Sequence, residues 1–316
     1  MTAAEQLLDA LESRIGQVVF GADTLLHHLA IGLICRGHVL LQGPPGLGKT
    51  LLARSLAAVL GGQFGRIQGT ADLMPSDLTG VHVFHAQHGR FELVRGPLFA
   101  DVVLFDEVNR AGPKTQSALL QAMEERSITI DREVYALSPD LLVAATQNPH
   151  EFEGTYPLPE SQLDRFLLRL ELDYPDTAVE QQVLRAYDRP DRDYREPLEN
   201  LTVLPAAAVA AARTQSAAVH VADTLYDYVC AVAQASRRHP QVALGLSTRG
   251  LLGLIRCARV ETALRAGAFV TPDDVKTVAP AVIAHRLVLS AEAQIEGVQA
   301  GQLVSQILHQ VPVPRA

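Results

Sequence analysis

Three short apolar runs in the first half of the chain show no polar alternation. They are His38–Leu41, Val102–Phe105 and Leu141–Ala145. Runs of this kind are typical of strands that are buried on both faces of a parallel sheet. Each run is followed by polar residues, as expected at the carboxyl ends of strands in an open α/β sheet. The pattern therefore predicts an α/β core built on a parallel sheet.

Two other parts of the chain alternate between apolar and polar residues on both sides of a polar turn. The first pairs Val81–Phe84 with Arg90–Val94, and the second pairs Ser127–Ile130 with Glu133–Leu137. Such alternation across a short turn is typical of a β-hairpin. We therefore expect two hairpins inserted into the α/β core.

The periodicity becomes helical after about residue 175. Asp223–Arg237 and Leu251–Ala266 repeat apolar residues with the spacing of amphipathic helices. Thr271–Asp274 has the order of an N-cap, a first-turn proline and two acids, which favours the start of a helix. The chain is thus predicted to divide into an α/β core at residues 1–175 and a smaller helical domain at residues 176–316.

Composition and charge narrow the class of protein. A chain of 316 residues, 48% of them hydrophobic, is large enough for two domains with a buried core. The net charge of -8 argues against a free-standing nucleic-acid-binding protein, which usually carries a basic surplus. The three cysteines lie far apart without metal-ligand spacing, and we interpret them as buried side chains in a reducing compartment.

The N-terminus and the apolar runs bear on location. The first residues form an amphipathic, acid-bearing stretch that is neither a signal peptide nor a transit peptide. No apolar run reaches the roughly 18 residues needed to span a bilayer. We therefore expect a cytoplasmic protein with no membrane span.

One glycine-rich segment has the chemistry of a phosphate-binding loop. Residues 43–50 match GxxxxGK[ST] in full and precede the apolar helical stretch Leu51–Leu60. Glycines let backbone N–H groups close around phosphate oxygens, and the helix N-terminus adds a positive field. Lys49 is expected to contact the β- and γ-phosphates of ATP, and the Thr50 hydroxyl to join the Mg²⁺ ligands. The predicted nucleotide-binding residues here are Gly43, Pro44, Pro45, Gly46, Leu47, Gly48, Lys49, Thr50 and Leu51.

Polar residues after the next two apolar runs complete the predicted site. Asp106 and Glu107 follow the second run, and Asn148 follows the third. Asp106 is predicted to hold Mg²⁺ through water, because Mg²⁺ keeps much of its hydration. Glu107 is predicted to orient or deprotonate the attacking water. Asn148 is expected to touch the γ-phosphate or the water, although asparagine before proline is also a common turn residue.

These residues in this order resemble the AAA+ superfamily of ATPases and, more closely, its MoxR family. The similarity covers nearly the whole chain, and the block from 102 to 166 is its most specific part. It implies a P-loop AAA+ core, in which helices and hairpin inserts flank a parallel sheet, and a smaller all-helical lid domain. The segments that carry the resemblance are Leu104–Ala111, Pro113–Leu120, Ala145–Pro149, Gly154–Glu160, Leu163–Phe166, Gly245–Arg249 and Val270–Val275.

The resemblance also implies residue roles that spacing alone does not show. Arg165 lies where such proteins carry an arginine finger that reaches the ATP of a neighbouring subunit. Arg249 lies at the sensor-2 position at the start of a lid helix, for which Ser247 is the expected cap. Val19 and Phe20 fall where the family packs the adenine, and Phe20 replaces a more usual polar residue.

A function follows from the same resemblance. An arginine acting between subunits implies a ring oligomer, expected as a hexamer, whose ATP turnover remodels or matures a protein partner. Partners with a von Willebrand factor A domain are expected in this family, and nucleic acid is not an expected partner. Two alternatives remain open: a DNA-associated motor of the same clade, and a P-loop small-molecule kinase that needs no arginine from a neighbour.

Overall fold

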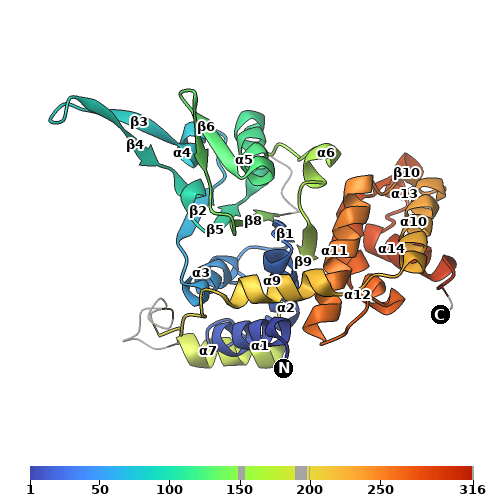
Figure 1. Cartoon of the computed structure of the whole chain (residues 1–316). Coiled ribbons are helices and arrows are strands. Elements are labelled where there is room, and N and C mark those ends of the chain that lie inside the picture. The colour runs from blue at the N-terminus through green and yellow to red at the C-terminus, as the bar shows by residue number, and fades with distance from the viewer. Residues whose placement is uncertain (149–153, 189–197, 199, 315–316) are drawn as a thin grey trace.

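A five-stranded sheet forms the centre of the molecule, and every neighbouring pair of its strands is parallel (Figure 1). The computed structural model describes residues 1–148, 154–188, 198 and 200–314. This arrangement confirms the predicted parallel α/β core. In spatial order the strands are β2 (Phe64–Gln68), β5 (Val102–Asp106), β8 (Leu142–Gln147), β1 (Val39–Gln42) and β9 (Leu168–Glu171).

The apolar pattern predicts the three central strands and misses the two edge strands. β1, β5 and β8 are buried along almost their whole length, so their sequences are continuously apolar. In β2 and β9 only alternate residues are buried, and polar residues stand between them. A search for continuous apolar runs therefore finds only the centre of this sheet.

Helices cover both faces of the sheet. Along β1, Val39 and Leu41 pack into one apolar cluster and Leu40 into another, because successive side chains of a strand point to opposite faces. The first cluster lies under α1, α2 and α3, and the second under α4 and α5. The helices of this half are α1 (Ala3–Ile15), α2 (Asp23–Ile34), α3 (Lys49–Leu60), α4 (Pro75–Thr79), α5 (Pro113–Glu125), α6 (Glu160–Leu163) and α7 (Thr177–Tyr187).

Both predicted hairpins are present. β3 (Gly80–His85) pairs with β4 (Arg90–Arg95), and β6 (Ser127–Ile130) pairs with β7 (Glu133–Ala136). Asp131 and Arg132 have φ of 48° and 80°, the left-handed conformation that a two-residue hairpin turn requires. Figure 1 shows that β3 and β4 project away from the body of the molecule.

The C-terminal part is mainly helical, as predicted, and its described residues include a short pair of strands. Thr271 caps α12 through a capping box, and Ser247 caps α11 by accepting a hydrogen bond from the Gly250 N–H. β10 (Val242–Leu244) and β11 (Val288–Leu289) pair antiparallel, a feature that an all-helical lid does not include. The helices are α9 (Ala208–Ala218), α10 (Asp223–Arg238), α11 (Thr248–Leu264), α12 (Pro272–Ile283), α13 (Ala291–Ile295) and α14 (Ala300–Gln310), with the 3₁₀ turn η3 (Ala284–Arg286) after α12.

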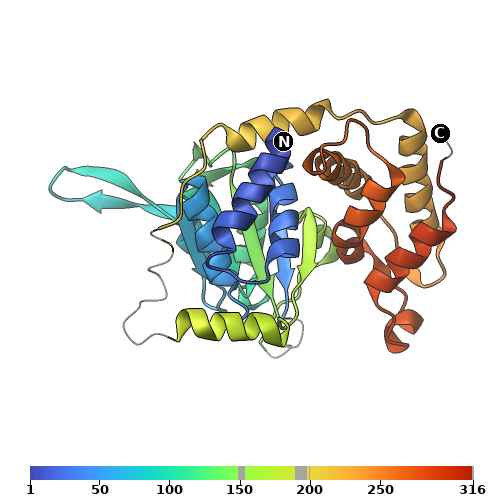
Figure 2. The same ribbon diagram turned by 90° about the horizontal axis from the view of Figure 1, so that it is seen from below.

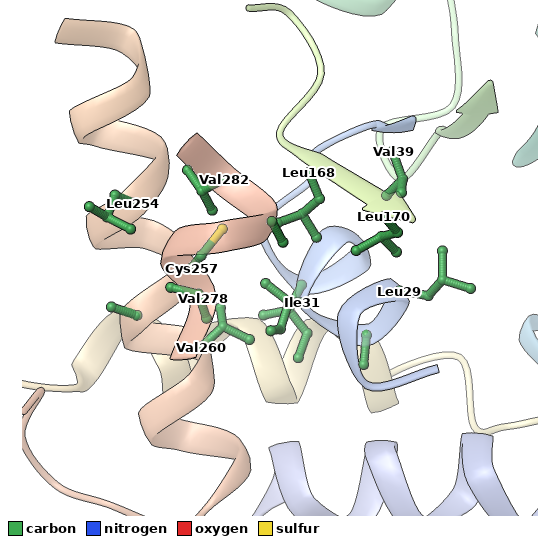
Figure 3. Close-up of a cluster of buried hydrophobic side chains, with 14 of the residues drawn as sticks. Leu29, Ile31, Val39, Leu168, Leu170, Leu254, Cys257, Val260, Val278 and Val282 are labelled. Atoms are coloured by element: carbon green, nitrogen blue, oxygen red, sulfur yellow. The ribbon is translucent and has the colours of Figure 1, made fainter. Parts of the chain in front are cut away.

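The core and the C-terminal helices share one apolar cluster. Leu168 of β9 and Ile31 of α2 lie beside Val278 and Val282 of α12, and Leu170 belongs to the same cluster (Figure 3). Figure 2 shows α9 running beside α1 toward the C-terminal helices, and α9 contacts α1, α2 and α11. Because α9 touches both parts, the division between residues 175 and 176 stays a prediction. Among the described residues, no helix combines the length and apolar character that a membrane span requires.

Candidate functional site

The loop between β1 and α3 has the geometry of an anion cradle. Gly46 and Gly48 have φ of 86° and 75°, a conformation that favours glycine. Within the part of the chain that the structure describes, a Cβ added at either glycine would meet no atom within 4 Å, so both face open space. Lys49 begins α3, and none of the described side chains caps this helix, so its first N–H groups are available to a ligand. The loop therefore presents open N–H donors at a positive helix end.

Lys49 lies at the edge of this cradle. Its ammonium donates a hydrogen bond of 2.7 Å to the Gly43 carbonyl. Burial lowers the pKa of Lys49, and the nearby carboxylates of Asp106 and Glu107 oppose that shift. A partly desolvated ammonium gains more from a phosphate than one that is fully hydrated.

The acidic residues stand at the end of the neighbouring strand. Asp106 is the last residue of β5, and Glu107 follows with φ 54° and ψ 54°. The left-handed conformation costs a residue with a side chain about 1–2 kcal/mol. Thr146 of β8 holds the turn, because its hydroxyl accepts from the Glu107 N–H at 2.8 Å and donates to Asp106 Oδ1 at 3.1 Å. A strained, cross-braced acidic pair of this kind suggests a functional role.

One cavity of about 490 Å³ brings the separate motifs together. It is bounded by the phosphate loop, the start of α3 and the ends of β2, β5 and β8. Pro149, which ends one of the family-like segments, lies outside the described residues. The predicted residues that line the cavity are Gly43, Pro45, Gly46, Leu47, Gly48, Lys49, Thr50, Leu51, Asp106, Glu107 and Asn148, whereas Pro44 is absent from its wall.

Sequence reasoning missed two polar residues of this cavity that come from β2. Arg66 pairs with Asp106, with Nη2 at 3.0 Å from Oδ2, and Gln68 donates from Nε2 to Glu107 Oε2 at 3.0 Å. Both contacts follow from the register, which places Gln68 beside Asp106. Their signal is the edge-strand alternation that the search for continuous apolar runs does not detect.

A larger apolar cavity of about 1050 Å³ continues from the phosphate loop. Val19 and Phe20 line it together with Tyr187 of α7, and their contact with the adenine stays a prediction. The rings of Phe20 and Tyr187 meet edge to face with centroids 6.5 Å apart, and the Tyr187 hydroxyl donates to the Val18 carbonyl at 2.6 Å. This wall suits a flat aromatic ring.

The two predicted arginines lie outside both cavities. Arg165 follows α6, Arg249 lies in the first turn of α11, and neither lines either cavity. Both bind the carboxylate of Glu124 on α5. Arg165 Nε lies 3.1 Å from Oε2, and Arg249 Nη2 donates to Oε1 at 2.6 Å. The structure therefore groups these arginines with each other and not with the phosphate loop of their own chain.

The donor atoms of the smaller cavity fit a magnesium nucleotide. Thr50, Asp106 and Glu107 offer the hard oxygen atoms that Mg²⁺ prefers. Lys49 and Arg66 supply cations for phosphate oxygens, and the open space beside Gly46 and Gly48 admits phosphates close to the backbone.

The fold and this site define a P-loop nucleotide-binding core of the AAA class joined to a lid. Residues 38–168 match the family described as "ATPase family associated with various cellular activities (AAA)", and residues 234–307 match the "AAA lid domain". The chain belongs to the MoxR family of AAA+ ATPases.

Three similar proteins illustrate the relationship. Uncharacterised protein YeaC of Bacillus subtilis is 41% identical over 98% of this chain and 95% of its own length. Chaperone MoxR1 of Mycobacterium tuberculosis is 36% identical over 100% of this chain and 84% of its own length. A solved structure of a candidate ATPase from Cytophaga hutchinsonii, 36% identical, superimposes with a TM-score of 0.90 and covers 99% of this chain and 96% of that one.

Proposed function

We propose that this chain hydrolyses ATP with Mg²⁺ in a ring, expected as a hexamer, and uses the turnover to remodel or mature a protein partner. The proposal rests on one observation: the phosphate loop, two acidic residues and one asparagine from separate strands line one cavity. Family membership supports ATPase chemistry in general, and the cavity supplies the specific groups.

Each group has a role that its chemistry supports. The Lys49 ammonium and the open N–H groups of α3 hold the phosphates. Thr50 and Asp106 would hold Mg²⁺, which neutralises charge on the phosphate oxygens when it is bound. Glu107 accepts a proton from the attacking water, and Asn148 orients that water or the γ-phosphate.

Arg165 and Arg249 support a site shared between subunits. Both side chains are partly exposed, with 31% and 45% of their surfaces accessible, and both point to the same glutamate. Two cations on one exposed surface can enter a neighbour's phosphate site, where water-excluded charge is worth far more than at the surface. In related phosphoryl-transfer systems such an arginine accelerates turnover about 10³–10⁵-fold.

The partner and the place of action extend the proposal. We propose a partner with a von Willebrand factor A domain, action in the cytoplasm, and residues 176–316 as the lid that follows a core at 1–175. A relative named as a chaperone supports action on proteins.

The test begins with Glu107→Gln, which keeps the side-chain shape but removes the base. We expect hydrolysis to fall about 10²–10⁴-fold while ATP binding and ring assembly persist. Arg165→Ala should also bind ATP yet turn over about 10³–10⁵-fold more slowly. Turnover, nucleotide affinity and native mass in Mg²⁺ and ATP measure these outcomes.

The wild-type protein provides the counter-test. Its turnover per subunit should rise with protein concentration as rings assemble. A monomeric mass during turnover, together with concentration-independent activity per subunit, would contradict the ring. Absence of any affinity for Mg²⁺–ATP would contradict the whole proposal. For the partner, the stalled Glu107→Gln protein should retain a von Willebrand factor A domain protein in ATP, whereas Lys49→Ala should not.

A further inference from the structure

A single carboxylate connects the lid to the segment that bears Arg165. Asp164 directly precedes Arg165, and two lid residues bind its side chain. Arg286 of η3 donates from Nε to Oδ1 at 2.7 Å, and the Ser247 hydroxyl lies 3.2 and 3.0 Å from Oδ1 and Oδ2. Only 22% of the Asp164 side-chain surface is accessible. The contact therefore lies in the joint between core and lid.

Arg286 holds the backbone of this segment as well as the carboxylate. Its side chain is 3% exposed. Besides Asp164 Oδ1, its guanidinium donates to the carbonyls of Asp164, Phe166 and Leu167 and to that of Val282. A guanidinium has five N–H donors, and these contacts use all of them in one fixed fork. The path of the chain on both sides of Arg165 is thus set by a lid residue.

The same carboxylate also fixes the start of α11. Ser247 is the N-cap of α11, and Arg249 lies in the first turn that it caps. Arg165 is one residue from Asp164 along the chain, and Arg249 is two residues from Ser247. At their far ends both arginines meet Glu124. The two arginines are therefore held at their bases by Asp164 and at their tips by Glu124.

We infer that Arg286 and Ser247 are positioning residues: by gripping Asp164 they hold Arg165 and Arg249 as one rigid unit aimed at the nucleotide of the neighbouring subunit. This inference rests on the proposed function. It adds that the lid of one subunit fixes the positions of Arg165 and Arg249, which act at the nucleotide site of the neighbouring subunit. Stability alone is a weak explanation for the buried pair of Asp164 and Arg286, because apolar residues of similar volume often replace such a pair without loss of stability.

The test uses a variant that disturbs the grip and leaves the helix capped. Ser247→Asp keeps an N-cap acceptor for the Gly250 N–H but places a second carboxylate against Asp164. The matched control is Ser290→Asp, which makes the same change at the N-cap of α13, where the serine hydroxyl accepts from the Ala293 N–H. A shift of about 1 Å in a positioned group can cost about 10²-fold in rate.

We expect Ser247→Asp to lose about 10²-fold in turnover while its ATP affinity and ring mass stay those of Ser290→Asp. Mixed with the Glu107→Gln protein, it should regain activity, because the mixing partner supplies correctly held arginines to the intact site of Ser247→Asp. Arg286→Lys, which cannot form the fork, should show the same loss and the same recovery. If Ser247 and Arg286 acted only inside their own subunit, mixing would restore no ATP turnover.

The Arg165→Ala protein, also mixed with the Glu107→Gln protein, tests the site shared between subunits separately from the positioning role of Ser247 and Arg286. If Arg165→Ala recovers and Ser247→Asp does not, the positioning role is wrong and the shared site stands. If the Ser247→Asp protein, measured without a mixing partner, turns over ATP as fast as Ser290→Asp, the positioning role is also wrong. If Arg165→Ala itself fails to recover, the arginines do not act between subunits, and both the shared site and the positioning role are wrong.

Discussion

Acid should weaken this fold through His38, a buried histidine that directly precedes β1, one of the three central strands. His38 is 5% exposed, and both of its ring nitrogens are engaged. The Val143 N–H donates to Nδ1 at 3.0 Å, and Nε2 lies 3.1 Å from the Met123 carbonyl. Because Nδ1 accepts, Nε2 must carry the only proton, and the imidazole is neutral. Burial and the nearby Arg126 guanidinium lower the pKa of His38 to about 4.

The magnitude follows from this shift. An unfolded chain binds the proton with a pKa of about 6.5, whereas the folded protein resists it until about pH 4. The unfolded state therefore holds more protons between these values, and the free energy of unfolding decreases as the pH falls through this window. The full effect of one such group is about 3 kcal/mol. Buried His285, whose pKa is also lowered by burial, should act in the same direction.

The assay is chemical denaturation at a series of pH values from 7 to 4, on the wild type and on His38→Gln. The variant is less stable at pH 7, since it loses a fitted side chain, but its dependence on pH should be shallower by about one proton, or about 1.4 kcal/mol per pH unit near pH 5. His309→Gln, a change at an exposed position, is the control. Equal slopes for His38→Gln and the wild type would refute the reasoning.

Two further changes test single contacts. Asp274 is 3% exposed and accepts hydrogen bonds from Arg265, Thr262 and Thr271. Asp274→Asn should therefore lower the free energy of unfolding, measured in denaturant titrations, by about 2 kcal/mol or more. A loss below about 0.5 kcal/mol would contradict this. Gln68→Ala removes one of the groups that bind the Glu107 carboxylate, another being Arg110 at 3.4 Å. Loss of this one hydrogen bond should raise basal ATP turnover up to about fivefold; a decrease would mean that Gln68 aids the reaction.

The sequence predicts this site as far as local patterns extend. The loop at 43–50, Asp106, Glu107 and Asn148 lie at or directly after the end of a strand whose burial makes it continuously apolar. Both the strand and the polar residues at its end are therefore recognisable. Parallel strands then bring those ends to one edge of the sheet, and all of these residues except Pro44 line the cavity.

The rest of the arrangement depends on contacts that have no local signal. Arg66 and Gln68 belong to an edge strand whose alternating pattern resembles many exposed segments. In the sequence, no local pattern distinguishes Glu124 from other acidic residues on helices. Its contact with Arg249 depends on how α11 packs in the folded chain. The pairing of Asp164 with Arg286 joins residues 122 positions apart, and only the packing of the lid on β9 brings them together.

The shared apolar cluster of Figure 3 limits how such a chain can be divided. A fragment ending at residue 175 would expose Leu168 and Ile31 to water, because they pack beside Val278 and Val282 in the intact chain. Such a fragment would associate with itself through this bare face instead of remaining a free nucleotide binder. If C-terminal halves were exchanged between distant relatives, the hybrid chain would fold only where the apolar residues of the core still fit those of the exchanged helices.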